Sequence, residues 1–190
     1  MSAREDIFAR VRANLPKGDY TLPALPRFKL DEAKGLVERF SAALAGMGGK
    51  VTEDPLDVSR TRLEGAKVVC SAVPEIQGNR NLDQVRQPRD LADVDIAVVR
   101  AVLGVAETGS VLFTESELKV NTLAYLAQHL VVLLARDAIV PGIQDAYEHP
   151  CFRTAHYAVF HTGPSATGDI EGVLIHGAQG VRSLTVILTG

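Results

Sequence analysis

Apolar residues recur along this chain in two patterns: short, nearly continuous runs, and longer stretches with helical spacing. The continuous runs are typical of strands buried on both faces of a parallel sheet. Strands separated by helical stretches of about ten to fifteen residues indicate βαβ units and a largely parallel sheet. We therefore expect strands at 50–52, 67–72, 94–99, 110–113, 130–134, 157–160 and 184–188.

Helical spacing is clearest over residues 33–47, with Asp31 as the predicted N-cap and a glycine-rich end at Gly46, Gly48 and Gly49. Asp169 is predicted to begin a further helix, because apolar residues follow it. Other helices are expected at 4–15, 56–63, 82–85, 120–127 and 141–148.

The first thirty residues are set apart from the rest. Ile7, Val11 and Leu15 form a thin apolar stripe, and Pro16, Pro23 and Pro26 enforce an extended connector behind it. Such a helix has too little core of its own, so it must pack on the main domain or on another chain. We divide the chain into an N-terminal helix and Pro-rich arm, 1–30, and an α/β domain, 31–190.

Composition fits a globular protein of one main domain, with 46% hydrophobic residues among 190. The formal charge of −3 provides no clustered basic face, so nucleic acid is not an expected partner. No apolar run approaches the roughly eighteen residues of a membrane helix, and no secretory leader opens the chain. The expected location is the cytoplasm.

The cysteines and histidines indicate no cofactor and no metal. Cys70 and Cys151 cannot supply the four thiolates of an iron–sulfur cluster, and Cys70 is expected to be a buried thiol. The five histidines lack the spacings of known metal sites, and there is no GxGxxG, Walker A or GxSxG motif. Only His161 is placed for catalysis, and its expected role is that of a polar residue that ends a strand.

Two segments combine glycines, small hydroxyl residues and carboxylates: Gly104–Ser110 and Gly163–Glu171. Each follows an apolar run, and ligands of α/β proteins bind at the carboxyl ends of such strands. We expect both segments to line one pocket.

In the second segment, Ser165, Thr167 and Asp169 precede the expected helix. Their side chains can cap it, while its free N–H groups and the flexible Gly163 and Gly168 suit a small anion. Capping without any ligand is the alternative explanation.

In the first segment, Glu107 is the candidate catalytic residue, and Gly104, Thr108 and Gly109 are candidate ligand-binding residues beside it. Glu107 is expected to be half-buried, which would tune it as a general base or nucleophile. Alternatively, it accepts hydrogen bonds from N–H groups of the second segment. The polar stretch 74–89 is expected to be an irregular loop, either functional or merely solvated.

These segments also carry a family resemblance. GVAETGS, GPSATGDIE and the run Gly177–Gly180 resemble the lactate-utilisation protein C family, whose defining unit is the LUD domain, from about Gly49 onward. Family members usually have alanine at Gly168 and histidine at Gln179. The resemblance implies an α/β three-layer sandwich with a mostly parallel central sheet, grouped with sugar-phosphate isomerases and coenzyme A transferases.

For function, the resemblance implies a component of L-lactate oxidation to pyruvate that acts with iron–sulfur partner proteins. The cysteine count favours a non-redox component that binds a small anionic ligand between the two segments. The alternative is an autonomous isomerase or acyl/CoA-transfer enzyme, since residues 106–109 look like the segment that bears the transferase nucleophile at Glu107. The glycine run of a coenzyme A pocket is absent.

Overall fold

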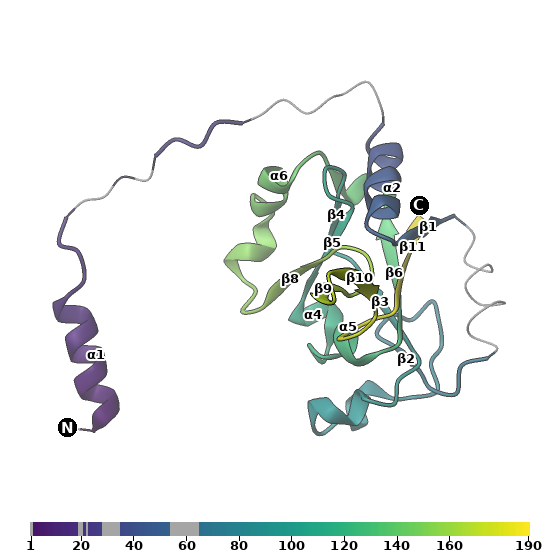
Figure 1. Cartoon of the computed structure of the whole chain (residues 1–190), viewed down its shortest axis with the longest axis horizontal. Helices are drawn as coiled ribbons and strands as arrows, with labels where there is room; N and C mark the ends of the chain where they lie inside the picture. The colour runs from purple at the N-terminus through teal and green to yellow at the C-terminus, as the bar shows by residue number, and fades with distance from the viewer. Residues whose placement is uncertain (1, 19–20, 22, 28–34, 54–64) are drawn as a thin grey trace.

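Two β-sheets and a hairpin form the framework of the protein (Figure 1). We describe a computed structural model, which covers residues 2–18, 21, 23–27, 35–53 and 65–190. A five-stranded sheet has the order β1-β11-β6-β3-β2, a four-stranded sheet has the order β7-β4-β5-β8, and β9 pairs with β10. The strands are β1 (Lys50–Thr52), β2 (Val69–Ser71), β3 (Ile96–Arg100), β4 (Leu103–Val105), β5 (Ser110–Thr114), β6 (His129–Ala135), β7 (Ile139–Val140), β8 (Ala158–His161), β9 (Ala166–Ile170), β10 (Val173–His176) and β11 (Ser183–Thr189).

The five-stranded sheet is parallel throughout, as the apolar runs predict. Its central strand β6 pairs with β11 along seven residues on one side and with β3 on the other. The four-stranded sheet differs, because β5 runs antiparallel to both β4 and β8. No strand was expected at β4.

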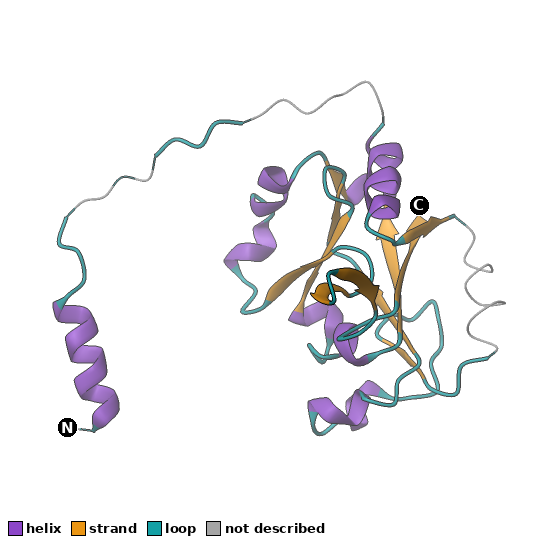
Figure 2. Ribbon diagram, in the orientation of Figure 1, coloured by secondary structure: helices purple, strands orange, loops and turns teal. Residues whose placement is uncertain are grey.

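The helices are short, and all except α1 lie around the sheets (Figure 2). They are α1 (Ala3–Ala13), α2 (Leu36–Gly46), α4 (Glu115–Leu118), α5 (Leu123–Leu126) and α6 (Ile143–Tyr147), with 3-10 turns at Leu82–Gln84, Pro88–Leu91, Arg136–Ala138 and Pro150–Arg153. Helices in 33–47, 120–127 and 141–148 are thus confirmed with shorter bounds. Gly35 occupies the N-cap of α2, while the predicted cap Asp31 and the predicted helix 56–63 lie outside the described residues. None of the described helices is long and apolar enough to cross a bilayer.

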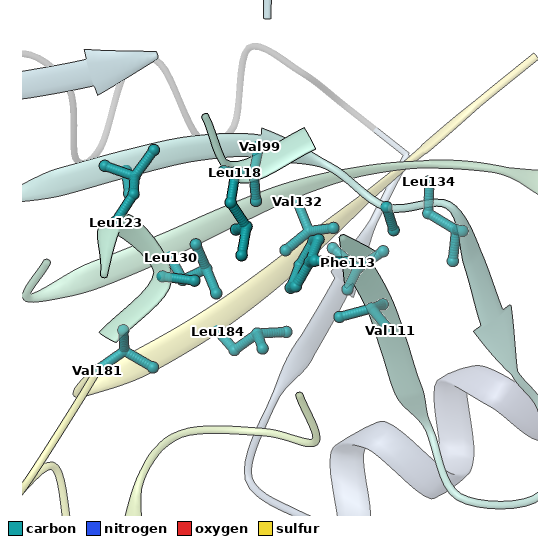
Figure 3. Close-up of a cluster of buried hydrophobic side chains, with 14 of the residues drawn as sticks. Val99, Val111, Phe113, Leu118, Leu123, Leu130, Val132, Leu134, Val181 and Leu184 are labelled. Carbon is teal, nitrogen blue, oxygen red and sulfur yellow. The ribbon is translucent and has the colours of Figure 1, made fainter. Parts of the chain in front are cut away.

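The main core lies between the parallel sheet, the four-stranded sheet and helices α2, α4 and α5 (Figure 3). Period-two alternation decides which side chains enter it. On β6, Leu130, Val132 and Leu134 face this core, while Val131 and Leu133 join a second apolar cluster. Each fully buried side chain of this kind stabilises the fold by roughly 1.5–3 kcal/mol.

A third apolar cluster forms around other side chains of the four-stranded sheet. Leu103, Val105 and Leu112 pack there with Ala146 of α6, and Phe152 and Phe160 border them. The four-stranded sheet therefore contributes side chains to two clusters, and α6 covers the cluster that lies away from α2.

The N-terminal helix α1 is well capped but unburied. Ser2 and Glu5 form a reciprocal capping box, and no residue of α1 is buried. Its apolar stripe, which includes Ile7 and Val11, is exposed. Of the two expected packings, the one on the main domain is not formed in the single chain, and packing on another chain stays a prediction. The arm behind it does reach the domain, where Arg27 pairs with Asp145 and Glu148 at α6.

Candidate functional site

The first predicted segment is the turn of a β-hairpin. Residues 106–109 join β4 to β5, and Gly109 adopts a φ of +69° there. Glu107 lies at the tip of the turn and is exposed, so the expectation of a half-buried carboxylate is wrong.

The Glu107 carboxylate nevertheless has a structural contact. Its Oε2 accepts a hydrogen bond of 3.0 Å from the backbone N–H of Ile143, at the start of α6. The Glu107 N–H itself donates to the carbonyl of Pro141. The carboxylate thus accepts a backbone donor, as the alternative explanation expected, but the donor comes from α6 rather than from the second segment.

A chain of hydroxyl groups connects the two predicted segments. The Thr108 Oγ1 lies 2.7 Å from the Ser110 Oγ, which lies 2.5 Å from the Thr162 Oγ1. Thr162 precedes Gly163, so the turn that carries Glu107 and the beginning of the second segment are adjacent in space.

Three of the predicted glycines lie against protein atoms. A Cβ built at Gly104 would fall 2.7 Å from Leu134 and 3.1 Å from Phe40. A Cβ at Gly109 would fall 2.3 Å from the backbone N of Leu44, and one at Gly163 would fall 2.3 Å from the carbonyl O of Met47. The absence of a side chain at these glycines therefore lets α2 and its C-terminal end pack closely against the sheet.

The second segment is a strand, so the predicted helix at Asp169 is wrong. Thr167 and Asp169 lie on β9, which returns as β10 through Glu171 and Gly172. Both turn residues have positive φ, 53° and 72°, the signature of a type I′ hairpin turn. Ser165, Thr167 and Asp169 consequently cap no helix. Thr167 bonds to Asp169 instead, while the Ser165 N–H and carbonyl bond to Val181 and Gly177.

A cavity of about 260 Å³ lies beside the beginning of this segment. We call it the His161 cavity. Its lining comes from three parts of the chain: 124–125 of α5, 159–165 at the end of β8, and 179–181 before β11. Of the predicted site residues, Gly163 and Ser165 line it. Glu107, Gly104, Thr108, Gly109, Thr167 and Asp169 are not among its lining residues.

His161 is the chemically distinctive residue of this cavity. Its ring contacts Phe113 at 5.4 Å and Tyr125 at 4.8 Å between centroids. Its Nε2 is buried and has no hydrogen-bond partner among the described residues. Burial lowers the pKa of His161 to about 4, so the imidazole is neutral at neutral pH. An unpaired buried polar atom costs about 1–3 kcal/mol, and such atoms often mark functional sites.

Three further polar residues of the cavity were not predicted: Tyr125, Thr162 and Gln179. The Tyr125 hydroxyl lies 2.5 Å from the Tyr157 hydroxyl, and Gln179 lines the cavity from the segment before β11. Burial and this hydrogen bond raise the pKa of Tyr125, so its hydroxyl stays neutral. Tyr125 lies 36 residues from His161 in the sequence, and no local pattern connects them.

A second, larger cleft of about 680 Å³ lies at the carboxyl end of β2. It is lined mainly by the loop 71–83, together with Lys119. Asn79 holds this loop against β2, since its side chain bonds the Val69 N–H and the Lys67 carbonyl. The Arg80 side chain bonds Asp93 and the carbonyl of Asp90. The predicted irregular loop is therefore firmly anchored.

Within the described ranges, no group of three or more His, Cys, Asp or Glu residues is placed to hold a metal ion. Cys70 is buried, as expected, and burial raises the pKa of its thiol. Cys151 is half-buried, and its pKa is raised for the same reason.

Comparison with known proteins gives three consistent results. The LUD domain family matches residues 60–189. A protein named "Lactate utilization protein C", from Geobacillus sp. (strain WCH70), is 27% identical over 117 residues, which are 58% of this chain and 46% of that protein. The match thus spans about half the length of that relative.

The fold also resembles a solved structure. The crystal structure of a DUF162 family protein from Deinococcus radiodurans matches with a TM-score of 0.61. The match covers 82% of this chain and 96% of that one at 15% sequence identity. At this identity the likeness concerns the fold alone, a mixed α/β fold with a parallel five-stranded sheet.

Proposed function

The chain belongs to the LUD domain family, and on that premise we propose that it is a non-redox component of lactate utilisation that binds a small anionic ligand. The ligand lies in the His161 cavity, between the end of β8 and the segment before β11. In this proposal the protein acts with iron–sulfur and oxidoreductase partners that oxidise L-lactate to pyruvate.

One observation carries the binding role: the buried, unpaired Nε2 of His161 in the wall of a cavity that also contains Gly163 and Ser165. Ligand sites of proteins are cavities in which few polar groups converge on an otherwise apolar wall. The cavity matches this description, since its lining combines the polar Ser165, Gln179 and His161 with the apolar Ala124, Val159 and Val181.

The non-redox role is supported by the cysteine count. A cluster bound by this chain alone would need four thiolates, and the chain has two cysteines. Iron–sulfur chemistry in lactate oxidation therefore falls to partner proteins. The similarity to a lactate-utilisation protein supports the pathway.

For the fold, we infer the three-layer sandwich of sugar-phosphate isomerases and coenzyme A transferases. Apolar clusters on both faces of the parallel sheet support it. The corresponding enzyme hypothesis, with Glu107 as base or nucleophile, has less support. Glu107 is exposed, engages the N–H of Ile143, and is not among the lining residues of the His161 cavity.

Growth on L-lactate tests the proposal. A deletion strain is complemented with the wild-type gene, with Ser165→Leu, which fills the cavity, or with Ala178→Leu, which adds the same bulk at an exposed position near the cavity. We expect Ser165→Leu to abolish growth on L-lactate, and Ala178→Leu to preserve it, with both variants melting like the wild type. Full growth with a folded Ser165→Leu protein would show that the cavity is not needed for growth on L-lactate.

Partner association is tested separately. Affinity purification of the tagged chain from lactate-grown cells should retrieve proteins with iron–sulfur absorbance. Purification of the chain alone, with no such partner at any salt concentration, would contradict the role as a component of an assembly.

A further inference from the structure

The wall of the His161 cavity carries no permanent charge. Among its lining residues only Tyr125 and His161 titrate, and the tyrosine hydroxyl stays neutral. An anion that enters such a cavity loses hydration and meets no cation, which costs far more than a hydrogen bond recovers. The binding of an anion proposed above therefore needs a source of positive charge.

His161 is the group that can supply it. The residues whose rings pack on its imidazole are Phe113 of β5 and Tyr125 of α5. Further out, Tyr157 pairs with Tyr125, and the Glu115 carboxylate is bonded to the N–H groups of His156 and Tyr157. Burial alone lowers the pKa of His161, and no neighbouring charge contributes to the shift. The free imidazole is therefore neutral, and only an incoming negative charge makes its protonated form favourable.

We propose that the ligand of this cavity is a small monocarboxylate, and that one proton is taken up by His161 for each carboxylate bound. This inference rests on the proposed function. The carboxylate stays ionised, the proton comes from the solvent, and the imidazolium N–H donates to a carboxylate oxygen, so the filled cavity has no net charge. Ser165 and Gln179 are then available for a hydroxyl or carbonyl group on the same ligand.

Access to Nε2 requires one side chain to move. The ring of Tyr125 lies 4.8 Å from the imidazole, and 39% of its surface is exposed. The proposal requires a rotation of this exposed side chain, which breaks the hydrogen bond between its hydroxyl and Tyr157.

Thermodynamic linkage gives the size of the effect. Between the pKa of free His161, about 4, and its higher pKa in the complex, each unit of decrease in pH strengthens binding tenfold. A carboxylate that bound without a proton would show no such slope above its own pKa.

Isothermal titration calorimetry of the full chain with L-lactate and with pyruvate tests the proposal. Titrations at pH 6.5 in phosphate, imidazole and Tris differ in buffer ionisation enthalpy, and the dependence of the observed heat on that enthalpy gives the number of protons taken up. We expect close to one proton to be taken up per ligand bound. The affinity at pH 6.5 should be tenfold weaker than the affinity at pH 5.5.

The variants assign the proton. His161→Gln should weaken binding and eliminate the uptake, whereas His176→Gln, at an exposed histidine of β10, should change neither. The ¹⁵N chemical shifts of His161 in the wild-type protein should change to imidazolium values on saturation, which tests the assignment even if His161→Gln fails to fold.

The outcomes separate the two proposals. Binding of either probe without proton uptake, or uptake that persists in His161→Gln, overturns the coupling and leaves the proposed function standing. Failure of both probes to bind at any pH overturns the coupling and the ligand-binding role together.

Discussion

The hydroxyl of Ser110 lies 2.5 Å from the hydroxyl of Thr162, although 52 residues separate them in the sequence. Ser110 also lies 2.7 Å from the hydroxyl of Thr108, so it holds the turn that carries Glu107 beside the entrance to the second segment. Ser110 is buried, with 4% of its surface exposed.

Ser110→Ala should therefore lower the free energy of unfolding by about 1–3 kcal/mol, because two hydroxyl groups lose a shared partner in a dry environment. Urea unfolding measures the change. Ser116→Ala, at an exposed position, is the control and should stay within about 0.5 kcal/mol. Equal stabilities for the two variants would show that the hydroxyl chain contributes nothing.

Three glycines in or beside the two segments distinguish the cost of backbone strain from the cost of steric crowding. Gly109→Ala combines a positive φ with a Cβ 2.3 Å from Leu44, and should cost about 2–4 kcal/mol. Gly172→Ala has a positive φ but open space, so about 1–2 kcal/mol is expected. Gly168→Ala has neither and should be nearly neutral. Thermal melts rank the three, and a neutral Gly109→Ala would contradict the close packing of α2.

Glu107 is expected to hold the start of α6 through the Ile143 N–H, and not to act as a base or nucleophile. Glu107→Gln keeps an oxygen for the Ile143 N–H, so the free energy of unfolding should fall by less than about 1 kcal/mol, with Glu107→Ala somewhat lower. Growth on L-lactate should persist with Glu107→Gln. A stable Glu107→Gln protein that supports no growth would instead identify Glu107 as a base or nucleophile.

Stability should fall in mild acid because of His161. Its pKa is about 4 in the folded protein and about 6.5 in the unfolded chain, so the unfolded chain binds the proton more readily. Stability that is intact above pH 6.5 is lost as the pH falls toward 4, by about 2 kcal/mol at pH 5. Urea unfolding of wild type and His161→Gln at pH 7.5 and 5.0 isolates this contribution. Parallel losses in both proteins would show that His161 does not titrate in this way.

The parallel sheet could be predicted because its strands are buried on both faces. Val131 and Leu133 enter one apolar cluster while Leu130 and Val132 enter another, so β6 reads as a continuous apolar run. A continuous apolar run of this kind predicts a strand buried on both faces without any knowledge of its neighbours.

The candidate site could be predicted only in part. Gly163 and Ser165 could be predicted because they lie in a local motif, whereas Tyr125 joins them through tertiary packing alone. The helix at Asp169 was predicted from hydroxyl and acidic residues before apolar ones. The decisive signal was Glu171-Gly172, a two-residue turn that reverses the chain. Exposure of Glu107 depends on how the described elements are arranged around the turn, which no local pattern encodes.

The position of β11 has a consequence for how the chain acquires its structure. This strand is the last described element to be synthesised, yet it lies between β1 and β6 in the sheet. Until residues 183–189 have emerged, β1 has no partner in this sheet, and β6 presents an open edge of seven residues, most of them apolar. Pairings across such distances form slowly, and an apolar edge that waits for its neighbour is a template for pairing with other chains. The growing chain is therefore expected to be most prone to aggregate in the interval between the synthesis of β6 and its pairing with β11.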